Sequence, residues 1–441
     1  MQHHRWFFAA LLILFLETAM DCTSVTAQSI ADTKTTNGPH KKLGQVGPWN
    51  LDEQYQVPSM RWLDQRGAIH SLLYSGQHYQ GKETEVFAFY ASPATLDPSQ
   101  AGKKFPGIVL IHGGGGTAFA EWVYLWAKRG YAAIAMDLSG SRPMDPVYDE
   151  KGVPKPGQTN APSTRQRLPN GGPDQGHPEK FDTIGGDVSD DWPWHAVANV
   201  IRAHSWLRSY VEVDSSRTAV TGISWGGYTT CLVASLDERF QAAVPVYGCG
   251  FLYEGESVQK PAIDKLGDRR EAWIRSYDPS SWLPRCKVPI LWVNGTNDVH
   301  YPLDSYQKSF EVVPGKSKWM RIEVQMRHSH PAGWAPAEIG YFVDSFCGLG
   351  ESLPNPGDIV INDDSVQVAY QSRLPLKEAA IHYTRVTGLR SQMNWMTLSA
   401  QVSDQKIVAP KLPAQANTWF VSMTDVRGAM VTTPIRIQSA P

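Results

Sequence analysis

A serine lies between two glycines in the segment Gly222-Ile223-Ser224-Trp225-Gly226, directly after the run 218–221. A G-x-S-x-G sequence between a strand and a helix is typical of a nucleophile elbow, where small flanking residues allow a sharp turn. The turn lifts the hydroxyl clear of the sheet, and the following helix directs its first N–H groups at developing negative charge. Ser224 is therefore the candidate nucleophile of an acyl-transfer reaction.

A serine hydroxyl is a weak nucleophile at neutral pH, so it needs a base and a carboxylate that orients the base. In hydrolases with this elbow, the acid follows the serine in the chain and the histidine follows the acid. Asp298 is the candidate acid, because it lies in the loop that leaves the apolar run 290–294. Two histidines follow the next strand. We predict that His330 is the base, since the chain needs a few residues to turn back, with His328 as the alternative base or a substrate contact.

The segment 112–116, His-Gly-Gly-Gly-Gly, follows an earlier apolar run and predicts part of an oxyanion hole. Glycine allows the backbone to approach a substrate carbonyl closely. We expect the donors to be the N–H of Trp225 and an N–H group from Gly113, Gly114 or Gly115. Each such donor contributes about 10²–10³ in rate.

Tryptophan is frequent around these segments. Trp122 and Trp126 have helical spacing, which favours core positions over substrate stacking. Trp225 and Trp334 neighbour candidate catalytic residues and are the better candidates for substrate contact. Metal-ligand spacings, a phosphate-binding loop and a dinucleotide fingerprint are not found in the sequence, which predicts no metal and no cofactor.

The elements that must position these residues alternate between strands and helices. Apolar runs predict strands at 105–112, 131–136, 218–221, 242–246, 290–293 and 320–325, and helices are expected at 118–129, 195–207, 226–236, 306–310 and 336–346. This alternation predicts an α/β-hydrolase fold, a mostly parallel sheet with helices on both faces. Two segments interrupt it. The Pro- and Gly-rich stretch 139–191 should border the site, because ligands bind beyond the carboxyl ends of parallel strands, and 254–283 should be partly helical.

The sequence also predicts the domain boundaries. Short runs between 49 and 91 predict antiparallel strands at the start of the catalytic domain, which is expected to span 48–348. A Gly- and Pro-rich linker at 349–357 follows. Short alternating runs at 358–441 predict a small all-β sandwich domain.

The N-terminal residues have the pattern of a secretory signal. Arg5 precedes an apolar core at 6–16 that is too short to span a bilayer, and Val25-Thr26-Ala27 offers a cleavage site. We expect cleavage after Ala27, a flexible leader at 28–47, and a secreted or periplasmic product without stable membrane insertion. An uncleaved N-terminal anchor is the alternative, and Cys22 is a weaker candidate for lipid attachment.

Composition limits the partners. The chain has 42% hydrophobic and 19% charged residues and a net charge of −2, without a long basic run, so nucleic acid is not an expected partner. Four cysteines follow the signal, and an exported protein can form disulfides whose pairing the sequence does not determine. Cys231 lies on an apolar helix and is expected to be a buried free thiol.

The segments 112–119, with Glu121-Trp122, and 129–137 resemble secreted bacterial α/β-hydrolases of the acetyl xylan esterase and dienelactone hydrolase-like group. The segments 222–228 and 328–334 are similar to the same group, which is related to the catalytic domains of prolyl oligopeptidases. The resemblance spans about 49–347, and the C-terminal region resembles the β domain of the PhoPQ-activated pathogenicity-related group. The Arg-Gly-Gln motif of acetyl xylan and cephalosporin deacetylases is missing here.

The resemblance implies a secreted serine esterase that removes acyl groups, acetyl above all, from a carbohydrate such as xylan through an acyl-enzyme. Two alternatives remain open. A peptidase of the prolyl oligopeptidase type uses the same three catalytic groups. A non-catalytic carbohydrate-binding or surface protein would use the C-terminal domain instead.

Overall fold

The computed structural model describes residues 42–157, 162–176 and 180–438. The predicted signal sequence, its cleavage site after Ala27, Cys22 and all but the last part of the leader lie outside these residues. The described residues from Leu43 onward form one compact unit. None of the helices in the described ranges combines the length and the apolar character that crossing a bilayer requires.

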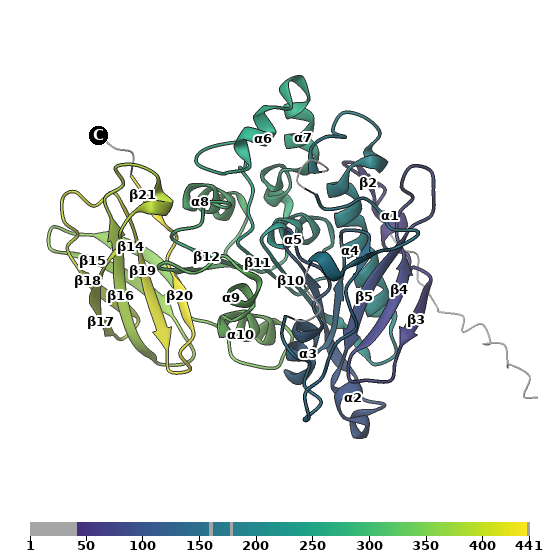
Figure 1. The fold of residues 1–441 in the computed structure, drawn as a ribbon. Coiled ribbons are helices and arrows are strands. Elements are labelled where there is room, and N and C mark those ends of the chain that lie inside the picture. Colours follow the sequence, from purple (N-terminus) through teal and green to yellow (C-terminus); the bar gives the residue numbers. More distant parts are fainter. Residues whose placement is uncertain (1–41, 158–161, 177–179, 439–441) are drawn as a thin grey trace, which may run out of the picture. The chain divides into compact units, whose positions relative to one another are not determined.

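The central sheet has the strand order β3-β4-β5-β7-β6-β10-β11-β12-β13 (Figure 1). Neighbours from β7 to β13 are parallel, and β3, β4 and β5 add antiparallel pairs at one side. The strands are β3 Met60–Asp64, β4 His70–Ser75, β5 Glu85–Ala91, β6 Phe105–Ile111, β7 Ala132–Met136, β10 Val213–Ile223, β11 Ala242–Val246, β12 Ile290–Gly295 and β13 Lys318–Glu323. This is the α/β-hydrolase fold, which confirms the predicted fold class.

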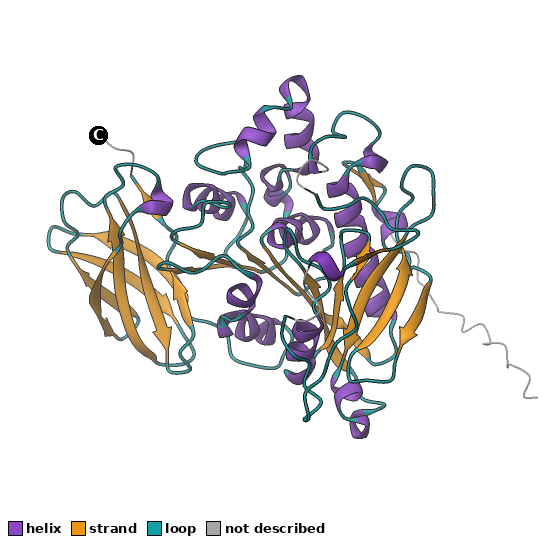
Figure 2. Ribbon diagram, in the orientation of Figure 1, coloured by secondary structure: helices purple, strands orange, loops and turns teal. Residues whose placement is uncertain are grey.

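Helices cover both faces of the parallel strands (Figures 1 and 2). Helices α4 and α5 pack against each other on the face that also carries α8, and α3 and α10 lie on the opposite face. Their bounds are α3 Ala120–Lys128, α4 Trp192–Ser209, α5 Trp225–Leu236, α8 Leu303–Val312 and α10 Ala337–Phe346. All five predicted helices are thus present, and Trp122 and Trp126 are buried in the core as expected.

The predicted strands form because their side chains are covered from both sides. Every residue of β6, β7, β11 and β12 is buried, which explains why these segments are continuous apolar runs instead of alternating ones. Short elements precede and connect them: β1 Gln45–Val46, β2 Trp49–Asn50, α1 Leu51–Gln54, α2 Pro93–Leu96 and the 3₁₀ turn η1 Pro98–Gln100.

Both interrupting segments contain short elements. The first holds β8 Ser141–Arg142, which pairs with β9 Gln166–Arg167, and the 3₁₀ turns η2 Pro162–Thr164 and η4 Val188–Asp190. The second is partly helical, as predicted, with α6 Lys260–Asp264, η5 Gly267–Arg269, α7 Arg270–Tyr277, η6 Pro279–Ser281 and η7 Leu283–Arg285. The five-residue helix α9, His330–Trp334, follows β13.

The C-terminal strands form an antiparallel series in the order β14-β15-β18-β17-β16-β19-β20, with β21 also on β19. They are β14 Asn355–Ile361, β15 Ser365–Gln371, β16 Leu376–Thr384, β17 Met396–Ser403, β18 Lys406–Pro410, β19 Thr418–Asp425, β20 Met430–Thr432 and β21 Arg436–Ile437, with η8 Arg390–Gln392 between β16 and β17. Strand β14 thus begins within the segment 349–357 that we expected to be a linker. Strand β20 joins the central sheet through the pair Met320↔Thr432 on β13. The four cysteines in the described ranges, Cys231, Cys249, Cys286 and Cys347, are free and buried.

Candidate active site

Ser224 occupies a strained turn between β10 and α5. Its φ of 60° and ψ of −118° lie outside the regions that residues with a side chain prefer. The backbone holds this conformation through hydrogen bonds at 2.8 Å from Ser224 N to Val246 O and from Tyr228 N to Ser224 O. A Cβ on Gly226 would lie 2.1 Å from Ile111 O, so only glycine fits there. The segment therefore has the geometry of the predicted nucleophile elbow.

Asp298 is fixed in the loop after β12. Its side chain is buried, and Oδ1 accepts the backbone N–H groups of His300 at 2.8 Å and Tyr301 at 2.9 Å. The other carboxylate oxygen, Oδ2, lies 2.7 Å from Nδ1 of His328. The His328 ring also stacks on Tyr247, with ring centroids 4.5 Å apart. Asp298 therefore orients His328 and leaves Nε2 of that imidazole for proton transfer.

We predicted that Asp298 orients His330, and the structure corrects this pairing. Gln325 adopts a φ of 59° just after β13, so the chain turns back sooner than we assumed and His328 already reaches the carboxylate. Ser329 then caps helix α9, its hydroxyl accepting the N–H of Ala332 at 3.2 Å. His330 is the first residue of this helix and faces the glycine-rich segment instead.

Nε2 of His330 accepts the backbone N–H of Gly113 at 2.9 Å. The ring lies against Phe119, with centroids 4.6 Å apart. Burial, together with smaller electrostatic effects of His112, His328 and Arg165, lowers the pKa of His330 to about 3. The imidazole is therefore neutral near pH 7. This agrees with its hydrogen bond, because Nε2 can accept the Gly113 N–H only when it carries no proton.

His112 fixes the other side of the same peptide. Its Nε2 accepts the N–H of Leu138 at 2.9 Å, so Nδ1 carries the proton and donates to Gly113 O at 2.8 Å. Gly116 N also donates to Gly113 O, at 2.9 Å. Burial lowers the pKa of His112 to about 4 and keeps it neutral. Both polar groups of Gly113 are thus used within the protein.

This arrangement changes which N–H groups can face a substrate. Gly113 N–H is occupied by His330, whereas Gly114 is exposed and its N–H has no partner among the described residues. A Cβ on Gly114 would lie 3.0 Å from Cδ1 of Trp225, the residue at the first position of α5. A Cβ on Gly113 would lie 3.0 Å from the Cβ of Ser224. The N–H groups of Gly114 and Trp225 are therefore the best candidate pair for an oxyanion hole, with Gly115 beside them.

Three further residues support the site and were not found from the sequence. Tyr247 has a φ of 52° and donates its hydroxyl to Arg327 O at 2.6 Å, which places its ring under His328. The Tyr301 hydroxyl is buried near the Ser224 side chain and makes no hydrogen bond of normal geometry among the described residues. Arg165 donates from Nη2 to Gly115 O at 2.5 Å. Of the three, only Tyr301 had a signal in the sequence that could have identified it, because it follows the candidate acid by three residues.

The two tryptophans predicted to contact substrate differ in exposure. The Trp225 ring is buried and packs edge-on against Trp192 and Phe181, with centroids 5.9 and 6.2 Å away. Trp334 is half-buried and packs edge-on against Phe119, with centroids 5.3 Å apart. Trp334 lines a cavity, whereas Trp225 offers its backbone.

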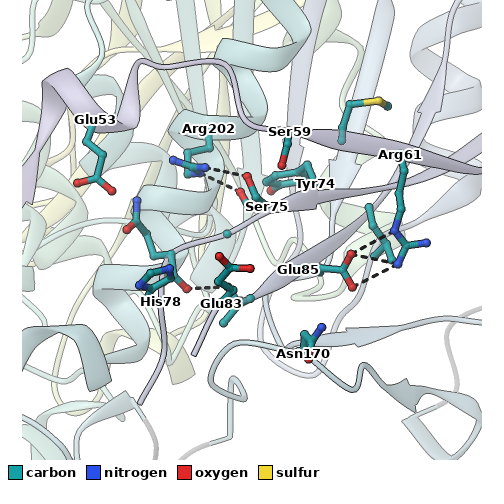
Figure 3. A pocket seen from close by; sticks show the side chains of 15 residues that line it. Glu53, Ser59, Arg61, Tyr74, Ser75, His78, Glu83, Glu85, Asn170 and Arg202 are labelled. Carbon is teal, nitrogen blue, oxygen red and sulfur yellow. Dashed lines mark hydrogen bonds and ion pairs between the residues drawn. The ribbon is translucent and has the colours of Figure 1, made fainter. Parts of the chain in front are cut away.

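Several cavities lie in the described part of the molecule, and two of them differ in their relation to the candidate site. One, of about 670 Å³, is lined by Gly115, Phe119, Arg165, His330 and Trp334 among others, and therefore adjoins the candidate site. The other, of about 590 Å³, lies at β3–β5 and includes none of the predicted site residues. Figure 3 shows its polar lining, with Arg202 bonded to Ser75 and Arg61 paired with Glu85.

Residues 170–344 match the prolyl oligopeptidase family. The matched part includes Ser224, Asp298, His328 and His330, and supports a serine hydrolase. A search of curated proteins found no match.

Solved structures that resemble the chain include esterases and peptidases. An acetyl xylan esterase from Paenibacillus sp. R4 is 18% identical with a TM-score of 0.47, over 64% of this chain and 87% of that one. Acetyl xylan esterase 1 from Thermoanaerobacterium sp. JW/SL YS485 is 16% identical with a TM-score of 0.47, over 68% and 94%. A Pyrococcus horikoshii acylaminoacyl peptidase is 17% identical with a TM-score of 0.40, over 62% and 38%. Similarity at this level does not distinguish ester from peptide substrates.

Proposed function

We propose that the protein is a serine esterase whose catalytic groups are Ser224, Asp298 and His328. The observation that carries the proposal is the 2.7 Å contact between Asp298 and Nδ1 of His328, on loops that follow neighbouring parallel strands at the edge where Ser224 lies. This contact fixes the imidazole tautomer, so Nε2 can accept the serine proton.

The reaction has two halves. Ser224 Oγ attacks the ester carbonyl while His328 takes its proton, and the negative oxygen of the tetrahedral intermediate accepts the N–H groups of Gly114 and Trp225. His328 then gives the proton to the departing alcohol, which leaves an acyl-enzyme. Water attacks this ester with His328 again as the base, and Ser224 leaves with the proton returned to it.

As substrate we propose an acylated carbohydrate, with acetylated xylan as the first to test. The proposal is supported by the resemblance of segments 112–119 and 328–334 to the acetyl xylan esterase group. A peptidase is the second candidate, because residues 170–344 match the prolyl oligopeptidase family.

The test begins with a fluorophosphonate probe on the full chain, with Ser224→Ala as the control. Labelling that is lost in the variant supports a serine hydrolase. The labelled enzyme is then assayed with p-nitrophenyl acetate, acetylated xylan and a proline-containing peptide anilide. Turnover of the anilide alone would reject the esterase in favour of the peptidase. Glycan binding without any hydrolysis, retained in Ser224→Ala, would reject both enzymes.

We further propose export from the cytoplasm with cleavage after Ala27. The proposal rests on Arg5 and the short apolar core 6–16. Mass spectrometry of the mature protein from the producing cells should find Gln28 at the N-terminus. A mature chain that still begins near Met1 would contradict the proposal.

A further inference from the structure

The cavity of about 670 Å³ beside the glycine-rich segment is open to solvent at one side and is lined mainly by three parts of the chain. Helix α3 contributes Tyr124 and Leu125, the inserted segment contributes Val153 and Pro154, and α9 contributes Trp334. Most of the surface that these residues present is carbon. The cavity therefore favours an apolar occupant over a free sugar, whose hydroxyls need hydrogen-bond partners.

A wall of rings leads from the candidate site into the cavity. The His330 ring lies 4.6 Å from Phe119, and Phe119 lies 5.3 Å from Trp334 with the rings nearly perpendicular. The first ring in this wall touches Gly113 through its Nε2, and Gly113 adjoins Ser224. A group attached to the reacting carbonyl can therefore extend along these rings into the cavity and stay in contact with the protein.

Two of the three charged side chains that line the cavity connect its walls, and the third, Lys128, is exposed on α3. Arg165 donates to Gly115 O at 2.5 Å, and Glu121 accepts the N–H of Gly157 at 3.3 Å. These contacts attach the inserted segment to the glycine-rich segment and to α3. Because most of the lining surface is carbon, apolar contact is the main interaction that the interior of the cavity offers a ligand.

We propose that this cavity binds an apolar or aromatic part of the ester substrate, so that esters with such a part, including acylated carbohydrates whose acyl group is larger than acetyl, are preferred to simple acetates. The inference rests on the proposed esterase function. Cavities of roughly 300–1,000 Å³ hold drug-sized ligands, so an acetyl group would leave most of this space unused. Each methylene group buried strengthens binding about fourfold, so two added methylenes should raise kcat/KM by at least about tenfold.

Two ester series distinguish the acyl side from the alcohol side. The first varies the acyl group as p-nitrophenyl acetate, butyrate and benzoate, and the second varies the alcohol as methyl, propyl and pentyl acetate, whose leaving groups have similar intrinsic reactivity. We expect kcat/KM to rise at least about tenfold in one series, which assigns that side of the substrate to the cavity. A flat or falling profile in both series would overturn the inference.

Filling the cavity tests the assignment directly. Leu125 is about half exposed on α3, so Leu125→Trp can be accommodated while its ring occupies the cavity. We expect the ratio of kcat/KM for the larger ester to that for the acetate to fall at least about tenfold. Val211→Trp, at a position that is 79% exposed and outside the cavity, should leave this ratio unchanged. Val153→Phe fills the cavity from the opposite wall and replaces Leu125→Trp if that variant does not fold.

A binding measurement separates failure of this inference from failure of the proposed function. Full-length Ser224→Ala is titrated with 1-naphthyl acetate, with isothermal titration calorimetry as the readout. Binding that weakens at least about fivefold on adding Leu125→Trp supports the cavity assignment even if no ester is hydrolysed. Ester hydrolysis with unchanged binding and an unchanged size ratio would overturn the assignment and leave the esterase intact.

Discussion

Two histidines that are close in the sequence should differ widely in their effect on catalysis. His328 contacts Asp298, whereas His330 contacts the Gly113 backbone. We expect His328→Ala to reduce kcat by at least about 10⁴-fold, because it removes the general base together with its orienting carboxylate contact.

The smaller effect of His330→Ala follows from its single hydrogen bond. The variant leaves the buried Gly113 N–H without its acceptor at 2.9 Å, which costs about 1–3 kcal/mol. If the whole cost appears in the transition state, kcat/KM falls about 5- to 150-fold. The two variants should therefore be separated by at least about two orders of magnitude.

The assay is hydrolysis of p-nitrophenyl acetate, with fluorophosphonate labelling as a second readout. His328→Ala should react very slowly with the probe. The labelling rate of His330→Ala should fall by about the same factor as its kcat/KM. Asp298→Asn is the matched control and should resemble His328→Ala, because it disturbs the same imidazole. Equal losses for the two histidines, or a larger loss for His330→Ala, would refute the reasoning.

Two further predictions concern stability and the elbow. Burial lowers the pKa of His112, His195 and His204 to about 4 in the folded protein, so below about pH 6.5 the unfolded chain binds more protons. Stability should then fall as the pH drops from 6.5 to 4, by up to about 1.4 kcal/mol per pH unit for each group, and urea unfolding that is unchanged over this range would contradict it. Gly226→Ala should abolish fluorophosphonate labelling and cost about 1–3 kcal/mol, because its Cβ meets backbone oxygen at 2.1 Å. Gly172→Ala, whose Cβ would lie 3.9 Å from the nearest side chain, should be neutral, and thermal unfolding compares the two.

The fold was largely predictable because its strands carry a strong local signal. Strand β11 has the predicted bounds, and β6 and β12 differ by one or two residues at their ends. Because these strands are buried on both faces, they consist of continuous apolar runs, and such runs can be recognised from the local sequence alone. The predicted linker was less informative: β14 begins inside it, since Pro356 and Gly357 are tolerated in a strand at the edge of a sheet.

The candidate site could be proposed from residue types, whereas the pairing of its side chains could be predicted only in part. The serine and the acid follow from motif and chain order. Which histidine meets Asp298 depends on the positive φ of Gln325 and on the cap at Ser329, and neither is encoded by a pattern of apolar residues. The free N–H of the glycine-rich segment depends on His330, 217 positions away in the chain.

The pairing of β20 with β13 means that a strand near the C-terminus covers the edge of the central sheet. Until 430–432 have been synthesised, the outermost parallel strand has backbone groups open to any other extended chain. Glu338 and Gln307 also accept the backbone N–H groups of Met430 and Ile435. Residues of the α/β region thus help to hold the C-terminal strand in place once it has been synthesised. A shortened chain that stops near 348 would keep the candidate catalytic residues, and the exposed edge of β13 should make it prone to self-association.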